Sequence, residues 1–395
     1  MGQNMKAFSR IFIISIVALA ILTSFSCKNG ATGLFESIAG ETSDGSNPTD
    51  GFKYANATNV VLINGTYYAA IGRLWERAKA GGLWEINEAK ADKYIDSLVA
   101  DSTKLYAIVK NTNGSLVGIQ NFDGTTWSDL SLDLTTQPGH VLRGLLAANG
   151  NILAWTEKYN TETTPSVYSF YSLNVTSFEL IPGLSEVDSG VPVNLLYDGT
   201  NYRLCTVTKL YAGATVSALA AVSPTLGSTA LNSGLAGIAF ANGRYFLTTS
   251  TGWIYTSADG ISWVNWTSGA TAFVNTDGKT FSFKTPATFS AGGFSYLIAP
   301  SVDAGTSSAT TTAKGYRMFT ISDAGTLALV SDFSPVSNLI NYNTTLELAS
   351  VSRVIPITDG STLTLFATTL GYGLWRNVWN GSNSTWSGWL RESDR

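Results

Sequence analysis

Charged side chains are scarce in this 395-residue sequence: they make up 13% of it, about half of the usual share for a soluble domain. The 24 basic and 28 acidic residues give a net charge of −4, and no cluster of Lys or Arg occurs. Nucleic-acid binding needs a concentrated positive surface. We therefore expect no nucleic-acid partner.

Histidine is almost absent as well, since His140 is the only one. This removes most metal sites and histidine-based catalytic schemes. His140 lies in "QPGHVLRG", a predicted loop before a strand, where we expect a surface position. No P-loop, dinucleotide fingerprint or Gly-x-Ser-x-Gly elbow occurs, and the Asp-bearing loops lack the alternating ligands of a calcium loop. The sequence predicts no metal and no cofactor.

The two cysteines, Cys27 and Cys205, have different settings. Cys205 lies in the predicted strand "YRLCTV", where a small buried hydrophobe is expected. Cys27 follows a segment with the composition of a secretory signal, residues 1–26: a basic start, a run of twelve mostly apolar residues and small residues before the cysteine. Twelve helical residues span about 18 Å, less than the ~30 Å core of a bilayer, which favours a cleaved signal over a permanent transmembrane helix.

The residues before Cys27 resemble the lipobox of bacterial lipoproteins. The usual Leu at −3 and Gly or Ala at −1 are here Ser24 and Ser26, a looseness similar to that of spirochaete lipoproteins. The resemblance implies palmitate and other acyl chains on Cys27, which together anchor a protein stably. It also implies a cell-envelope location. We favour the outer membrane or cell surface over the inner membrane, because Lys28 replaces the Asp that retains lipoproteins at the inner membrane in enteric bacteria.

The rest of the chain divides into a linker and one folded domain. Residues 27–52 are rich in Gly, Ser, Thr, Asn and Asp without apolar periodicity, which predicts a flexible tether behind the lipidated cysteine. Residues 53–395 carry most of the aromatic residues, which make up 12% of the chain, and the tight-turn glycines of a β-rich domain. We expect this domain to be a monomer with almost no helix.

Asn-Gly and Asp-Gly turns between apolar, aromatic-rich runs recur in this domain, and they are strong hairpin signals. We place first hairpins at about residues 65, 103, 150, 199, 243, 293 and 360. The 343 residues of the domain give 343/7, about 49, per hairpin, and four-stranded propeller blades take ~40–50. The predicted fold is therefore an all-β, seven-bladed β-propeller of four-stranded blades.

Some alternatives remain open for this fold. Six or eight blades are compatible with the spacing, because Gly278 would open an eighth blade and residues 303–315 are interpreted as a loop insertion. A pair of β-sandwiches is the second choice of fold. A strand near Lys53–Thr58 is expected to join the last blade, which ends at Trp386–Leu390, and so close the ring.

A second turn type ends in tryptophan at Trp127, Trp263 and Trp386. The copy "SADGISW" resembles the Asp-box of sialidases and other propeller proteins, one residue shorter than Ser-x-Asp-x-Gly-x-Thr-Trp. In those families the element is a structural hairpin, so the resemblance supports the propeller architecture and says little about chemistry.

The Asp-box resemblance also suggests a sialidase-like enzyme, which would need an arginine triad, a tyrosine nucleophile and carboxylates. The candidate carboxylates show no paired arrangement, and we interpret the arginines as solvated strand residues. We therefore predict no catalytic residue. The arginines are Arg73, Arg143, Arg203, Arg244, Arg317, Arg353 and Arg376, and the carboxylates Glu85, Asp133, Glu157 and Asp198.

Trp75, Trp253 and Trp375 start strands after a glycine in three of the units. Packing between blades explains such a repeated position. The alternative is that they line a carbohydrate or peptide site by stacking, which makes them the candidate ligand-binding residues.

Two functions fit this sequence. The first is a membrane-anchored envelope lipoprotein whose propeller binds or scaffolds a protein, peptide or glycan, without catalysis. The alternative is an envelope glycoside hydrolase or lyase. A charged centre with clustered Arg, Tyr and Glu would favour the enzyme, whereas a funnel lined by neutral residues would favour the binding module.

Overall fold

The computed structural model describes residues 56–159, 165–227, 229–231, 233–266, 282–302, 315–330, 349–382 and 384–392. Contact clustering separates residues 1–51 from a compact unit, Phe52–Arg395, and all of the described residues belong to that unit. The predicted signal peptide, the tether and Cys27 lie outside the described residues, as do Gly278 and residues 303–314 of the predicted insertion.

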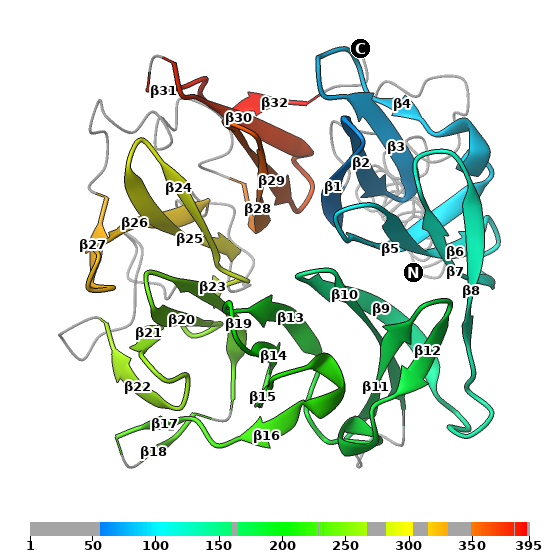
Figure 1. Ribbon diagram of the computed structural model, residues 1–395, viewed down its shortest axis with the longest axis horizontal. Helices are drawn as coiled ribbons and strands as arrows, with labels where there is room; N and C mark the ends of the chain where they lie inside the picture. Colours follow the sequence, from blue (N-terminus) through cyan, green and yellow to red (C-terminus); the bar gives the residue numbers. More distant parts are fainter. Residues whose placement is uncertain are drawn as a thin grey trace, which may run out of the picture. The chain divides into compact units, whose positions relative to one another are not determined.

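The described part of the chain is built from short antiparallel strands. Its first half contains β1 (Asn59–Ile63), β2 (Thr66–Ile71), β3 (Arg73–Ala78), β4 (Glu85–Ile86), β5 (Lys93–Ala100), β6 (Leu105–Asn111), β7 (Leu116–Phe122), β8 (Trp127–Leu132), β9 (Val141–Ala148), β10 (Asn151–Lys158), β11 (Val167–Asn174), β12 (Ser177–Leu180), β13 (Pro192–Tyr197), β14 (Tyr202–Thr206), β15 (Leu210–Gly213) and β16 (Ala220–Val222). Figure 1 shows these strands and those that follow.

The second half continues the same pattern. It contains β17 (Thr225–Leu226), β18 (Thr229–Ala230), β19 (Leu235–Ala241), β20 (Arg244–Thr249), β21 (Ile254–Ser257), β22 (Ser262–Asn265), β23 (Ser282–Phe283), β24 (Ala287–Ala291), β25 (Phe294–Val302), β26 (Tyr316–Ile321), β27 (Leu327–Leu329), β28 (Val351–Asp359), β29 (Thr362–Thr369), β30 (Leu374–Asn380), β31 (Thr385–Trp386) and β32 (Leu390–Arg391). The helices of the described residues are three single 3₁₀ turns, Glu88–Lys90, Pro182–Leu184 and Val216–Ala218, which confirms the prediction of almost no helix.

The predicted hairpin turns are confirmed. Each joins two antiparallel strands, namely β1–β2, β5–β6, β9–β10, β13–β14, β19–β20, β24–β25 and β28–β29. The Asn-Gly pairs explain why these hairpin turns could be predicted from the sequence. Asn64 and Gly65 have φ of 49° and 77°, and Asn242 and Gly243 have 48° and 71°. Both central residues of a type I′ turn need positive φ, which Asn and Gly adopt most readily.

The prediction of seven separate four-stranded blades is wrong. The described strands form six hydrogen-bonded sheets, with four, eight, four, six, five and five strands. In the eight-stranded sheet, β8 and β12 pair in parallel through Ser131–Ser177 and Leu132–Phe178 and so join two successive meanders. An outer strand has unpaired backbone groups on its free side, and another strand can take them up. The hairpins were predicted correctly, but their division into equal, separate blades was not.

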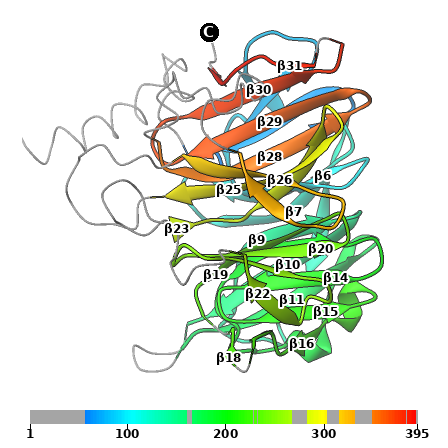
Figure 2. The ribbon, with the colours of Figure 1, turned by 90° about the vertical axis from the view of Figure 1, so that its left-hand side faces the viewer.

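The first strand of each hairpin lies on the inner side of its sheet, and these inner strands form a closed ring. In chain order, each contacts the next, and the last contacts the first: β1, β5, β9, β13, β19, β24 and β28. Figure 1 shows the sheets arranged around a common centre, and Figure 2 shows β28, β29 and β30 side by side within one sheet. A closed ring of radially stacked antiparallel sheets defines a β-propeller.

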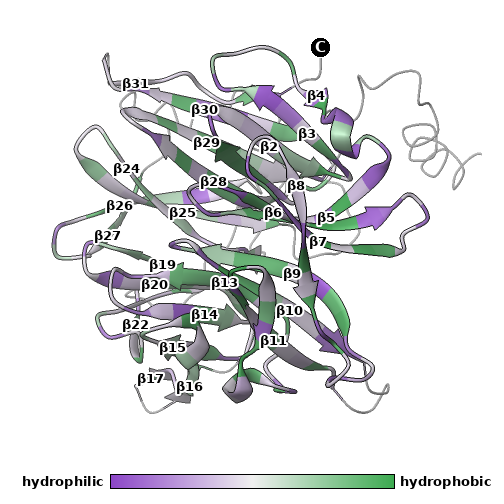
Figure 3. Ribbon diagram, turned by 45° about the vertical axis from the view of Figure 1, so that its right-hand side comes forward, coloured by the Kyte–Doolittle hydropathy of each residue, from purple (hydrophilic) through white to green (hydrophobic). Residues whose placement is uncertain are grey.

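The hydrophobic core lies between neighbouring sheets, so both faces of a middle strand are buried. In β29, seven of eight residues are buried, without the alternation of a half-exposed strand. The first and last sheets pack through Tyr67, Trp84 and Phe366, whose rings meet edge to face. Figure 3 shows hydrophobic residues along inner strand β9 and hydrophilic ones on the more peripheral β3.

Five inner strands contain a register shift near their start. One extra residue stands there in each, namely Asp96, Arg143, Val193, Ala236 and Ser352. Such a β-bulge bends the strand and redirects the side chain that follows it. These following residues are Ser97, Gly144, Asn194, Gly237 and Arg353.

Part of the strand predicted near Lys53–Thr58 lies outside the described residues, so its pairing with the last blade stays a prediction. Thr58 donates its N–H to Ala70 of β2, within the first sheet. Closure of the ring involves four side chains that we call the closure cluster: Arg77, Trp84, Arg376 and Glu392. The buried carboxylate of Glu392 accepts hydrogen bonds from Arg77 and from Trp84 Nε1 (2.6 Å), and it forms an ion pair with Arg376 Nε (2.8 Å). It therefore joins the first sheet to the last.

Candidate binding site

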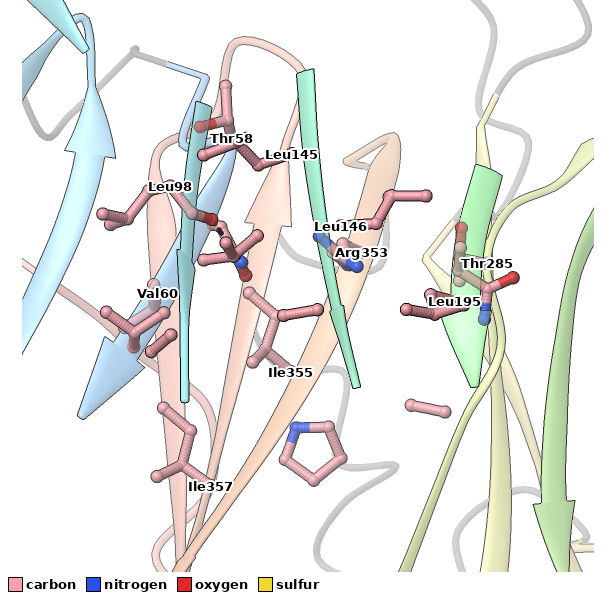
Figure 4. A pocket seen from close by; sticks show the side chains of 18 of the residues that line it. Thr58, Val60, Leu98, Leu145, Leu146, Leu195, Thr285, Arg353, Ile355 and Ile357 are labelled. Carbon is pink, nitrogen blue, oxygen red and sulfur yellow. Dashed lines mark hydrogen bonds between the residues drawn. The ribbon is translucent and has the colours of Figure 1, made fainter. Parts of the chain in front are cut away.

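A cavity of about 460 Å³ lies among the inner strands. Its wall consists of residues from β1, β5, β9, β13, β24 and β28, together with Thr285 and Pro286 before β24. Figure 4 shows aliphatic residues of several strands around it, among them Val60, Leu98 and Ile355. Val60 and Leu98 are 1% and 2% exposed and pack between sheets, whereas Ile355 is partly exposed. This volume lies within the ~300–1,000 Å³ range of small-ligand sites.

Three polar side chains in the wall of this cavity already bind neighbouring inner strands. Asn59 donates from Nδ2 to the carbonyl of Leu98 (2.8 Å), and Ser97 Oγ accepts the N–H of Leu145 (3.1 Å). Asn194 donates to the carbonyl of Ile238 and accepts its N–H. These bonds hold one inner strand to the next and stabilise the ring around the cavity.

Arg353 is the charged residue of the cavity wall. It follows the bulge of β28, at the position that Asn194 takes in β13. Asn194 binds the next strand, whereas the Arg353 guanidinium has no hydrogen bond or ion pair with any other described residue. Partial burial lowers the pKa of the Arg353 guanidinium. In Figure 4, Arg353 lies among the aliphatic side chains of the wall.

Among the described residues, the wall of the cavity contains no Asp, Glu, His or Cys. Across the described ranges, no group of three such residues is placed to hold a metal ion. Catalysis by paired carboxylates needs two acidic groups on either side of the scissile bond. The arrangement here offers one cation, backbone groups and apolar contacts, which is a chemistry of binding.

The tryptophans considered for ligand stacking lie away from this cavity. Trp75 and Trp375 are 5% and 4% exposed and belong to the packing between sheets. Trp375 also donates from Nε1 to the carbonyl of Tyr372 (2.9 Å). Trp253 is partly exposed and stacks on Tyr255 at 6.4 Å between ring centres. Their role in ligand binding stays a prediction.

Some of the sialidase candidates are brought together in pairs, but away from the cavity. Arg203 lies 3.8 Å from Asp198, whose carboxylate also accepts a hydrogen bond from the Tyr245 hydroxyl. Arg143 pairs with Glu157 (2.9 Å) on β9 and β10, and Arg376 belongs to the closure cluster. Arg203 stacks on Tyr245 and donates to the carbonyl of Asp259. Of the seven arginines, Arg353 is the one in the cavity wall.

The turn that resembles an Asp-box is tightly hydrogen bonded. Asp259 Oδ1 accepts the N–H groups of Ile261 and Ser262 and the hydroxyl of Ser257. The two backbone bonds hold the pKa of Asp259 well below its usual value. Trp263 then packs into the core at 2% exposure. This geometry is structural, a stable turn between β21 and β22.

Two further sequence interpretations can be compared with the structure. His140 is buried, not on the surface as expected: its Nδ1 lies 2.9 Å from Thr156 Oγ1, and burial lowers its pKa. The sequence concealed this because the burial depends on contact with Thr156 of β10, the strand that pairs with β9. Cys205 is fully buried, as predicted, and burial raises the pKa of its thiol.

Sequence reasoning missed Arg353 and Glu392 as important positions. Arg353 was interpreted as a solvated strand residue, and Glu392 was not considered. A weak signal did exist for Arg353, because it stands in the unusually apolar run "SVSRVIPI". An arginine between hydrophobic residues of a buried strand needs a partner or a polar cavity.

The described part of the chain is thus a β-propeller with a central cavity that contains a single charged group. Neither a family model nor a curated protein matches the sequence. Among solved structures, it is similar to an ancestral GH74 enzyme, with a TM-score of 0.58 and 11% identity over 87% of this chain and 47% of that one. This chain thus spans about half the length of the enzyme.

It is also similar to YCF48 bound to D1 peptide, with a TM-score of 0.50 and 14% identity over 82% of this chain and 92% of that one. At such identities, the likeness establishes the fold and leaves the function open. Within the described residues, no helix has the length and apolar character needed to cross a membrane.

Proposed function

We propose that this protein is a cell-envelope binding module that holds a peptide segment of a partner protein at the centre of its propeller. The observation that carries the proposal is the cavity wall, which combines aliphatic side chains and uncharged polar groups with Arg353 and lacks carboxylates. A wall of this kind suits recognition and lacks the acid and base of a hydrolase. The similar propeller YCF48 has been solved bound to a peptide.

Glycoside hydrolysis is the second candidate, favoured by the likeness to the GH74 enzyme. It requires two carboxylates about 5–10 Å apart around the sugar. The acidic residues of the described chain lie in turns, ion pairs and the closure cluster, for example Asp259, Glu157 and Glu392. A hydrolytic site would therefore have to lie away from the central cavity.

The test separates these functions with one preparation of the full chain. Tetrapeptides and cell-wall glycans are offered to the immobilised protein, and products are followed by mass spectrometry. We expect saturable peptide binding without turnover. Release of a sugar product would replace this proposal with the hydrolase.

We further propose that lipid on Cys27 tethers the propeller to a membrane, with the outer membrane or cell surface favoured. The support is the signal-like segment followed by the lipobox-like residues Ser24–Cys27. The flexible composition of residues 27–52 would keep the domain clear of the bilayer.

Replacing Cys27 with Ala is expected to abolish incorporation of labelled palmitate and to move the protein out of the membrane fraction, because lipoprotein acylation requires that thiol. Cys205→Ala is the matched control and should leave both unchanged, since its thiol is buried. Equal labelling of wild type and C27A would refute the anchor.

A further inference from the structure

The inner strands form the edges of their sheets. In the order of strands within the sheets, β1, β5, β9, β13, β19 and β28 each stand at an end. Each of these inner strands is therefore hydrogen bonded to a neighbouring strand of its sheet along one side only. Its other side faces the next inner strand or the cavity. Edge strands present N–H and C=O groups that suit the backbone of a peptide.

The second observation is the charge within the cavity. Arg353 is partly exposed, lines the cavity and has no counter-ion among the described residues. The two residues that follow it in the chain are apolar, with Val354 2% exposed and Ile355 also in the wall. A guanidinium in such surroundings lacks compensation for the water that it has lost. An anionic group in the cavity would supply it.

The geometry of the Arg353 guanidinium favours a carboxylate as the anionic group of the ligand. A guanidinium presents parallel N–H donors that match the two oxygens of a carboxylate. A single positive charge balances one negative charge, whereas a dianionic phosphate would leave a surplus charge in an apolar wall. Partly exposed aliphatic residues of the wall, including Leu146, Ile355 and Ile357, then provide contact for apolar parts of the ligand.

We propose that Arg353 binds the carboxylate of a short apolar peptide seated in the central cavity, with the edges of the inner strands contacting its backbone. This rests on the proposed function and deepens it, since it names the anchoring group. A carboxylate reaches the cavity either as a free C-terminus or as an Asp side chain, and the experiment distinguishes these sources.

The probes are apolar tetrapeptides made in three forms: with a free C-terminus, with a C-terminal amide, and as an amide with an internal Asp. Binding to the full chain is measured by calorimetry. We expect the free-acid form to bind at least tenfold more tightly than the plain amide. Rescue by the internal Asp would identify a side-chain carboxylate as equally suitable. Inorganic phosphate is expected to bind more weakly than either acid.

The variant Arg353→Met removes the charge and keeps an apolar chain of similar length. We expect it to lose the preference for the free acid, while its melting temperature stays equal to that of the wild type or rises, because an uncompensated cation has been removed. A merely structural arginine would instead lower the melting temperature when replaced. Arg143→Met, at the bulge of β9, is the control and should bind like the wild type.

Each outcome decides between the proposals. Equal binding of acid and amide forms, unchanged in R353M, would overturn the role of Arg353 and leave peptide binding intact. Absence of binding by every tetrapeptide would overturn both.

Discussion

Replacing Glu392 with Ala is expected to lower the free energy of unfolding by about 3–5 kcal/mol, the range seen when one partner of a buried ion pair is removed. The residue is 5% exposed, and its carboxylate accepts hydrogen bonds from Arg77 and Trp84 and forms an ion pair with Arg376. Its loss leaves the buried Arg77 without its counter-ion and removes the polar link between the first and last sheets.

The measurement is urea denaturation followed by tryptophan fluorescence. Glu157→Ala is the matched control, because Glu157 pairs with an arginine whose side chain is 48% exposed. Exposed pairs contribute at most about 1 kcal/mol. Losses of similar size in E392A and E157A would show that the closure cluster does not hold the ring together.

The second large effect is expected at Gly237, which follows the bulge of β19. Its φ is +144°, and an added Cβ would lie 2.8 Å from Pro286 Cδ and 2.8 Å from Thr285 Cα. The backbone strain of such a φ costs about 1–3 kcal/mol, and overpacking costs about 1–3 kcal/mol more. We therefore expect Gly237→Ala to lower the free energy of unfolding by about 2–6 kcal/mol.

Gly243→Ala provides the comparison within the same hairpin. Gly243 has a φ of +71°, and nothing lies within 4 Å of an added Cβ. Gly243→Ala therefore measures the cost of backbone strain without a close contact. Thermal and urea unfolding of both variants then show how much more stability Gly237→Ala loses. If the two variants lose equal stability, the close approach of Thr285 and Pro286 is not restrictive.

The sequence predicted best what depends on neighbouring residues. Asn64-Gly65 and Asn242-Gly243 specify their turns locally, because few residues other than Asn and Gly tolerate two successive positive φ values. The propeller followed from the repetition of such hairpins. By contrast, the pairing of β8 with β12 joins residues 131 and 177, and no local pattern encodes that contact.

The candidate site was harder to predict for the same reason. Arg353 faces a cavity whose wall is assembled from strands spread over almost 300 positions, and the bulge that redirects it leaves no signature in the sequence. His140 is a similar case, since its burial depends on Thr156 in the following strand. Of the tryptophans that the sequence suggested as ligand contacts, Trp75 and Trp375 lie in the packing between sheets, and Trp253 is partly buried against the core.

The closure cluster joins residues that are synthesised far apart in time. Arg77 and Glu392 are separated by 315 positions. At roughly 5–20 residues per second, a ribosome needs roughly 15–60 s to pass from one to the other. During that interval, the first sheet has been synthesised, but Glu392, which joins it to the last sheet, has not. The polar link between the first and last sheets therefore forms only after nearly the whole chain has been synthesised.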